Sequence, residues 1–289
     1  MGLKDYRYDG KKKFKLSDYP TGCGMGKKEK EDILAKTLKN IDEIAALQDK
    51  LYADGRESVL IILQAMDAAG KDGTIKHVMS GINPQGVDVI SFKSPSAIES
   101  AHDFLWRIHK NTPAKGQIAI FNRSYYEDVL VWRVREYNKT CKMPKRCNTD
   151  DTEKFYAKRY KHIKNYEEFL YDNGCRIVKI FLNVSKDAQK ARFMERIDNP
   201  AKNWKFSSSD IKERQLWDKY QEAYQLAIAN TSTKDCPWYI LPADKKWYTR
   251  YLVSEVVLKT LKDCDPQYPE LAASEKAKLA EYKEALMNE

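Results

Sequence analysis

Short apolar runs alternate with segments of helical periodicity along this chain. Five runs rich in β-branched and aromatic residues have the pattern of strands buried on both faces; they lie at 59–63, 87–92, 116–121, 176–184 and 237–241. Apolar residues recur at helical spacing in the remaining segments: 30–53, 75–80, 96–108, 150–173, 185–197, 210–230, 246–264 and 274–288. Strands that alternate with helices predict an α/β fold, a doubly wound parallel sheet with helices on both faces.

The two ends of the chain differ from this pattern. Residues 1–30 hold nine Lys and Arg against four Asp and Glu and are interrupted by glycine and proline, so we expect an extended arm with little regular structure. Such a charge run is either a solvated tail or part of an anion-binding surface. The predicted organisation is a basic arm over 1–30, one large α/β domain over 31–265 and a helical tail over 266–289.

Composition narrows the function. The 289 residues are 42% hydrophobic and carry a formal net charge of +9, which indicates a folded domain with an anionic partner. No run approaches the ~18 apolar residues of a membrane helix, and the N-terminus lacks the apolar core of a signal peptide. The six cysteines form no C-x-x-C pair, and the four histidines have no metal-binding spacing. We therefore expect reduced thiols, a cytoplasmic location and no membrane partner.

The stretch from Ser58 to Thr74 reads SVLIILQAMDAAGKDGT and holds the strongest chemical pattern. A buried strand runs through a loop of small residues into a helix, which is the context of a phosphate-binding P-loop. Small residues let backbone N–H groups point inward, the helix N-terminus adds partial positive charge, and Lys71 reaches a transferred phosphate. The motif is incomplete, because Ala65 replaces the first glycine and Asp72 the final Ser or Thr. The alternative is an ordinary strand–helix connection with a solvated Lys71.

Other candidates converge on the same edge of the sheet. In open α/β sheets, ligands bind beyond the carboxyl ends of the strands, and four segments are expected there: 65–74, Lys93, 122–123 and 242–244. The third strand ends at Asn122, where a P-loop kinase normally has an aspartate that organises magnesium. The candidates to replace that carboxylate are Asp67, Glu127 and Asp128.

A basic helix–loop–helix over 186–214 follows the fourth strand, at the place where small P-loop kinases have a mobile lid. Its Arg192, Arg196 and Lys205 would clamp phosphates and exclude water on closure. The alternative is a solvated, charged helix face.

Several separated segments resemble the polyphosphate kinase type 2 family. They are 60–86 (LIILQAMDAAGKDGTIKHVMSGINPQG), 92–96, 102–107, 120–131 (IFNRSYYEDVLV) and the lid residues Arg192, Arg196, Pro200, Trp204, Lys205 and Asp210. The resemblance covers roughly residues 30 to 265. It implies a P-loop kinase-like fold with a helical lid. It also implies reversible transfer of the terminal phosphoryl group between inorganic polyphosphate and a nucleotide, with magnesium or manganese.

The resemblance also implies residue roles. Asp67, Lys71, Arg123 and Glu127 would be catalytic, with Asp67 also binding the metal and Asn122 and Glu127 contacting the nucleotide. The phosphate-binding positions would be Ala69, Gly70, Asp72, Gly73, Thr74, Lys76, Lys93, Arg107 and Arg133, the last four residues forming a track for the polyanion. Asn122 followed by Glu127 and Asp128 is similar to the class that accepts both AMP and ADP.

The partners implied are polyphosphate and the adenine nucleotides AMP, ADP and ATP, with no nucleic acid, and the assembly is expected to be a dimer or tetramer. One alternative is an ATP-dependent P-loop kinase of a small metabolite or nucleoside monophosphate. Another is a non-catalytic RNA- or polyanion-binding protein, although the sequence lacks an RNA-recognition pattern.

Overall fold

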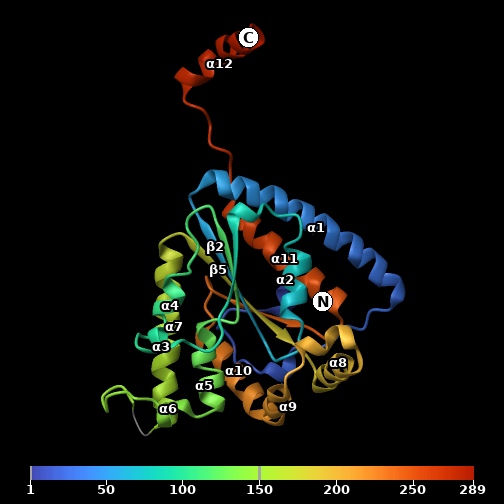
Figure 1. Cartoon of the computed structure of the whole chain (residues 1–289), viewed down its shortest axis with the longest axis vertical. Helices are drawn as coiled ribbons and strands as arrows, with labels where there is room; N and C mark the ends of the chain where they lie inside the picture. Colours follow the sequence, from blue (N-terminus) through green and yellow to red (C-terminus); the bar gives the residue numbers. More distant parts are fainter. Residues whose placement is uncertain (1, 149–150) are drawn as a thin grey trace.

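A sheet that contains the five predicted strands and one more, β1, lies at the centre of the molecule (Figure 1). The computed structural model describes residues 2–148 and 151–289, and within them the sheet order is β1-β6-β5-β2-β4-β3. The strands are β1 Arg7–Tyr8, β2 Ser58–Ala65, β3 Val87–Ser91, β4 Ile118–Asn122, β5 Cys175–Asn183 and β6 Trp238–Pro242. Strands β2 to β6 are parallel to their neighbours, and β1 pairs with β6 in the antiparallel direction.

Strand β2 occupies the middle of the parallel part. All eight of its residues are buried, as expected for a run of aliphatic side chains covered on both faces. Its two neighbours are β4 on one side and β5 on the other, so the chain winds to opposite sides of β2. This change of direction creates a crevice at the carboxyl end of β2, where α/β sheets bind their ligands.

Helices cover both faces of the sheet, as predicted (Figure 1). On one face α11 (Lys246–Cys264) packs on β5 and β6 and is itself covered by α1 (Lys27–Asp54) and α2 (Lys71–Val78). On the other face α7 (Thr152–Asp172) packs on β5 and against α10 (Trp217–Thr231). The other helices are α3 Ala97–Ser100, α4 Trp106–His109, α5 Val131–Val134, α6 Tyr137–Thr140, α8 Lys186–Asp198, α9 Ser208–Gln215 and α12 Ala273–Met287, with 3₁₀ turns η1 Leu3–Tyr6, η2 Leu16–Asp18, η3 Pro84–Gly86, η4 Tyr125–Asp128 and η5 Pro200–Lys205.

Two of the predicted helices are interrupted. The segment 96–108 forms α3 and α4, separated by a turn in which the backbone N–H of Leu105 donates to Asp103 Oδ1 at 2.9 Å. The segment 210–230 divides into α9 and α10 at Leu216. The helix predicted over 150–173 is α7, and residue 150 lies outside the described residues.

The N-terminal segment is more regular than the sequence indicates, so the prediction of an arm with little regular structure is wrong for its first half. Tyr8 of β1 pairs with Trp238 of β6. Tyr6, Tyr8, Phe14 and Leu16 are all buried in the core. The aromatic residues are the sequence feature that indicates packing of this segment. Burying their side chains stabilises the packed conformation by more than exposing the neighbouring lysines to water stabilises an open one.

A buried ion pair fixes the turn that follows β4. Lys179 of β5 and Glu167 of α7 are almost completely buried, with 2.5 Å between Nζ and Oε2. The hydroxyls of Tyr125 and Tyr126 donate to Glu167 Oε1 at 2.8 and 2.7 Å. A buried pair is tolerated where its remaining polar atoms are hydrogen-bonded, and these bonds fasten η4 to the core directly after Arg123.

Two helical segments stand apart from the layers. Elements α8, η5 and α9 form a lobe beside the carboxyl ends of the strands, as predicted for residues 186–214 (Figure 1). Helix α12 has no buried residue and projects away from the rest of the molecule. Within the described part of the chain, no helix combines the length and apolarity that crossing a membrane would need.

Candidate functional site

The loop between β2 and α2, residues 66–70, joins a buried strand to a helix N-terminus, as a P-loop does. Helix α2 begins at Lys71, so its free N–H groups lie at the carboxyl end of β2. Gly70 has φ 107° and Ala68 has φ 59°; the first value suits glycine alone, and the second is a strained position of the kind found at functional sites. The Lys71 ammonium donates to the carbonyl of Ala65 at 3.1 Å, so the side chain folds back over the loop.

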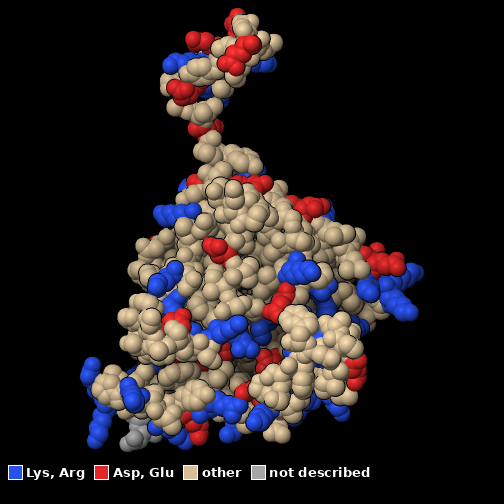
Figure 2. Space-filling model, in the orientation of Figure 1, with Lys and Arg blue, Asp and Glu red and all other residues tan. Residues whose placement is uncertain are grey.

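A cavity of about 680 Å³ opens above this loop. Its walls come from the ends of β2, β3 and β4, from the lobe of α8, η5 and α9, and from the first turn of α11. Figure 2 shows Lys and Arg side chains gathered around a hollow on this face. The lining contains nine Lys and Arg and four Asp and Glu, so its formal net charge is +5. Such a cavity attracts a polyanion.

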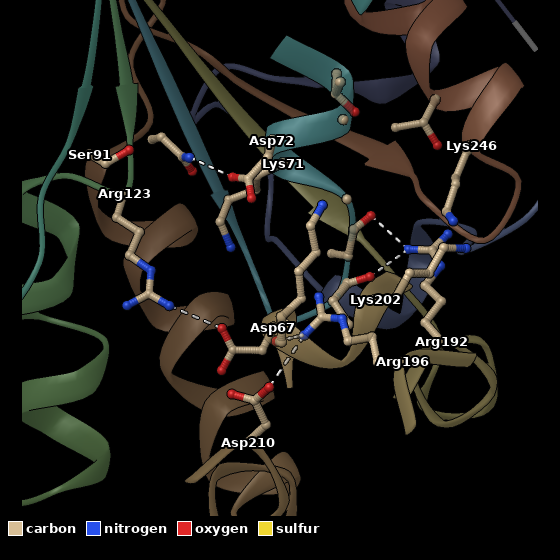
Figure 3. A pocket seen from close by; sticks show the side chains of 18 of the residues that line it. Asp67, Lys71, Asp72, Ser91, Arg123, Arg192, Arg196, Lys202, Asp210 and Lys246 are labelled. Atoms are coloured by element: carbon tan, nitrogen blue, oxygen red, sulfur yellow. Dashed lines mark hydrogen bonds and ion pairs between the residues drawn. The ribbon is translucent and has the colours of Figure 1, made fainter. Parts of the chain in front are cut away.

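Most of the predicted site residues line this cavity. They are Asp67, Ala69, Gly70, Lys71, Asp72, Gly73, Thr74, Lys93, Asn122, Arg123, Arg192, Arg196 and Lys205. Figure 3 shows Lys71, Arg123 and Arg196 reaching into it from three different elements.

Lys71, Asp67 and Arg123 form the charged centre of the cavity. Burial lowers the pKa of Lys71, and the carboxylate of Asp67 partly offsets this. Arg123 pairs with Asp67 at 3.1 Å, and its backbone has φ 67°. Burial opposes the charged form of Arg123, but Glu127 and Asp67 together raise its pKa. Asp67 thus holds Arg123, the Ala65 carbonyl holds Lys71, and the two cations face one cavity, an arrangement suited to neutralising phosphate charge.

Asn122 takes the position of the expected strand-end aspartate. Its Nδ2 donates to Asp72 Oδ1 at 2.7 Å (Figure 3). Its Oδ1 is buried and has no hydrogen-bond partner among the described residues. A buried acceptor of this kind is available to a bound ligand.

Glu127 does not line the cavity, although it is close enough to Arg123 and Lys71 to interact with their charges. Burial raises the pKa of Glu127, while Arg123 and Lys71 act in the opposite direction. Asp128 also lies outside the cavity and is buried. Its pKa is raised to about 7 by burial, with Arg159 and Arg107 opposing the shift.

Three of the four residues predicted for a polyanion track lie outside the cavity lining, and only Lys93 belongs to it. Arg107 is mostly buried and donates to the backbone carbonyl of Lys93 at 2.8 Å. Arg133 pairs with Glu153 and lies over the ring of Tyr156. Lys76 is an exposed residue of α2. In this conformation these three side chains do not face the phosphate site.

Arg192 and Arg196 differ in what they offer a ligand. The guanidinium of Arg192 donates to the carbonyls of Ala68, Ala69 and Ala243 at 2.9, 2.7 and 2.5 Å. These donors of Arg192 are therefore occupied by backbone carbonyls. Arg196 pairs with Asp210 at 3.3 Å across the lobe. The pKa of Asp210 is raised, mainly by burial and to a smaller extent by the negative charge of Asp67.

Several residues that line the cavity were not predicted from the sequence. Lys246, Thr249 and Arg250 lie in the first turn of α11. Their i, i+3, i+4 spacing puts them on one helix face directly after β6, which is the signal that would have found them. Ser91 and Glu195 also belong to the lining, and no sequence pattern singles them out.

The oxygen atoms of the cavity fit a hard divalent cation. Asp67, Asp72 and Asp210 bring carboxylates to the lining, beside the free Oδ1 of Asn122. Among residues 2–148 and 151–289, no three His, Cys, Asp or Glu side chains are close enough to hold a metal by themselves. Magnesium usually takes only one or two carboxylates and completes its shell with water and substrate phosphates, so this sparse set is suitable.

Comparison with known proteins gives one consistent result. The family model described as Polyphosphate kinase 2 matches residues 27–269. The chain is 45% identical over 285 residues to an ADP-polyphosphate phosphotransferase of Rhodopseudomonas palustris, covering 98% of each protein. It is 45% identical over 279 residues to an AMP/ADP-polyphosphate phosphotransferase of Meiothermus ruber, covering 95% of the chain and 98% of the relative.

A solved structure supports the same relationship. The crystal structure of Polyphosphate Kinase 2 from Arthrobacter aurescens TC1 is similar to this chain with a TM-score of 0.83 and 38% sequence identity, over 96% of this chain and 95% of that one. The α/β fold of P-loop kinase type expected from the sequence is confirmed.

Proposed function

Since the chain belongs to the polyphosphate kinase 2 family, we propose that it transfers the terminal phosphoryl group of inorganic polyphosphate to ADP, and to AMP, reversibly. The observation that carries this proposal is a cavity of net positive charge built around the P-loop. Near-complete coverage of relatives named as polyphosphate phosphotransferases supports it, and favours it over an ATP-dependent kinase of another metabolite.

In the proposed mechanism, positioning and charge neutralisation supply most of the rate enhancement, because the transition state of phosphoryl transfer is loose and anionic. Lys71 and the N-terminal amides of α2 would hold the transferred group, and Arg123 would bind its equatorial oxygens. Asp67 would keep Arg123 in place through their 3.1 Å ion pair. The lobe of α8, η5 and α9 would exclude water from the phosphates.

We propose Mg²⁺ as the metal, held by Asp67 and completed by substrate phosphates and water; Mn²⁺ would substitute, since it shares the preference for oxygen ligands. The metal would supply charge to neutralise the phosphate oxygens.

The acceptor range is a separate proposal. The two relatives at 45% identity differ in name, one for ADP alone and one for AMP and ADP. We propose that this chain accepts both, because Asn122 and Glu127 are similar to the dual-acceptor class. The experiment supplies AMP or ADP with polyphosphate and Mg²⁺, without ATP, and follows the nucleotides by chromatography. ADP and then ATP from AMP supports the proposal, and ATP from ADP only would limit the activity to one acceptor.

Lys71→Met provides the matched test of the site. Removing this cation is expected to lower kcat by about 1,000-fold or more, because a buried cation at the transferred group is lost. Lys36→Met, at an exposed position of α1, is the control for an altered lysine. Near-normal turnover by Lys71→Met would place the reaction elsewhere.

We further propose a cytoplasmic location and a homo-oligomeric state, dimer or tetramer. All six cysteines are free thiols, which agrees with a reducing compartment. Light scattering coupled to size exclusion would give the assembly mass.

A further inference from the structure

The outer side of the P-loop is fastened to α8. Gln189 Nε2 donates to the backbone carbonyl of Asp67 at 2.9 Å, and Arg192 Nη1 donates to the next two carbonyls, those of Ala68 and Ala69. Three consecutive carbonyls are thus held toward α8. A carbonyl fixed in this way cannot turn into the cavity, where its partial negative charge would repel a phosphate.

The base of α8 is a rigid support for these bonds. Ser185 caps the helix, and its backbone N–H donates to Asp244 Oδ1 at 2.7 Å. Arg192 Nη2 donates to Ala243 at the end of β6. The helix is therefore tied both to the P-loop and to the segment after β6.

The orientation of the Gln189 amide is determined by Arg214 of α9. Arg214 Nη1 donates to Gln189 Oε1 at 2.7 Å and to the carbonyl of Lys186 at 2.8 Å. A guanidinium has no acceptor atom, so only the oxygen of the amide can face it. The Nε2 group must then face Asp67. Gln189 is 1% exposed, so water cannot replace Arg214 or the Asp67 carbonyl as its hydrogen-bond partner.

Asp67 is the residue that this chain of bonds places. Its carboxylate pairs with Arg123, and its carbonyl is held by Gln189. Rotation of the peptide after Asp67 would change both the direction of the Asp67 carbonyl that Gln189 holds and the strained backbone of Ala68 (φ 59°). The lobe is thereby linked to the P-loop through one side chain.

We propose that Gln189, oriented by Arg214, is a positioning residue that fixes the peptide of Asp67 and so the phosphate and metal geometry of the P-loop. This inference rests on the proposed function for its kinetic consequences. Gln189 does not touch the reacting atoms, so its loss acts on the geometry of Asp67 rather than on nucleotide contacts.

The kinetic test uses Gln189→Met, which keeps the length of the side chain and removes both hydrogen bonds. We expect kcat for ATP formation to fall about 10-fold, the KM for ADP to change less than about 2-fold, and half-saturation by Mg²⁺ to need several times more metal. Arg214→Met should show the same pattern. The kcat of the double variant should be at most about 2-fold lower than that of the less active single variant, because both changes break the same series of hydrogen bonds.

Two further variants separate positioning from stability. Gln189→Glu keeps an acceptor for Arg214 and preserves packing but has no donor for Asp67, so it should lose kcat as Gln189→Met does. Gln225→Met removes a comparable hydrogen bond far from the cavity, to the backbone N–H of Leu16. This control should lower Tm at most and leave kcat unchanged. Full kcat in Gln189→Glu would overturn the inference.

Tripolyphosphate affinity, measured by titration calorimetry, does not depend on turnover. Gln189→Met should bind it about 5- to 10-fold more weakly than the unaltered protein, since the P-loop is less well ordered for phosphate. Weaker binding in a protein that makes no ATP would contradict the proposed function and still support the inference. Unchanged affinity, kcat and Mg²⁺ requirement would refute the inference alone.

Discussion

At the scale of single residues, burial moves the charges around the site away from their ordinary behaviour. Lys71 and Glu127 are shifted toward their neutral forms by burial, while each is drawn back by the opposite charges around it. The protonation of both side chains is therefore sensitive to the charge of neighbouring groups.

Asp128 makes the stability of the fold depend on pH. Its pKa of about 7 in the folded protein lies above the ordinary value of 3.8, so between these two pH values the folded state keeps a proton that the unfolded chain releases. Stability from this group is then fully present below pH ~4 and is lost as the pH rises through ~7. In Asp128→Asn this dependence disappears.

The measurement is the free energy of unfolding by urea at pH 5 and pH 8. The loss between these two values should be smaller in Asp128→Asn than in the unaltered protein, by on the order of 1–3 kcal/mol. Equal losses in both proteins would show that Asp128 is ionised in the fold at pH 5. Asp42→Asn, at an exposed position of α1, is the control for the loss of a carboxylate.

The sequence predicted the residues of the P-loop, but it did not predict which groups bind the arginines that lie outside the cavity. Asp67 and Lys71 follow a strand that its own apolar residues define, so their place at the sheet edge comes from local pattern. Arg107 and Arg133 looked equally free to bind a polyanion. They are instead held by the Lys93 carbonyl and by Glu153. Such pairings join segments that only the folded chain brings together.

At the scale of elements, the lobe divides into a fixed base and a more exposed end. Helix α8 is tied to the P-loop, whereas η5 carries Lys202 and Lys205 on exposed turns. Lys202 pairs with Glu195, and Lys205 lies 4.8 Å from the ring centre of Trp204, which is 78% exposed. Both lysines line the cavity, so we expect them to contact a polyanion that enters it.

Replacing Lys202 and Lys205 together by alanine should weaken polyphosphate binding with little effect on chemistry. We expect the KM for polyphosphate to rise about 10-fold and its dependence on salt concentration to become weaker. The kcat should stay within about 2-fold of that of the unaltered protein. Steady-state kinetics at several salt concentrations provide the check. The matched control is Lys158→Ala with Lys161→Ala, both exposed on α7. If the control pair behaves identically, the effect is one of net charge alone.

Elements with a strong apolar period were predicted closely, and those shaped by caps were not. Helix α11 was predicted with its observed bounds, 246–264. The helix expected over 210–230 is broken at Leu216, beside Arg214 and Glu213, whose side chains reach α8 and Arg135. A break that satisfies tertiary hydrogen bonds has no local sequence signal, because Leu and its neighbours are good helix formers.

At the scale of the whole molecule, the C-terminal segment contributes least to the fold. No residue of α12 is buried, whereas Gln267 still donates its backbone N–H to Asp54 at 2.7 Å. We propose residues 31–265 as the catalytic domain, to whose sheet the N-terminal segment adds β1. Removing residues 272–289 should leave Tm within about 2 °C and kcat within about 2-fold, since almost no apolar contact is lost.

Differential scanning calorimetry and the ADP assay test this truncation, with the mass of the assembly measured alongside. A large fall in Tm together with a smaller assembly would mean that α12 packs against another copy of the chain. Truncation within residues 1–16 is the contrasting case. It removes β1 and the four buried side chains of the N-terminal segment, and is expected to destabilise the protein by several kcal/mol.

The pairing of β1 with β6 sets an order in time as well as in space. Tyr8 is made about 230 residues before its partner Trp238, an interval of roughly 10 to 50 s at ordinary rates of synthesis. During that interval the aromatic residues of the first strand have no place to pack. A chain released before β6 is complete would also leave β5 as an open parallel edge, which is a template for pairing between molecules. The first strand to leave the ribosome is thus among the last to be placed, and full-length synthesis is a condition for a closed sheet.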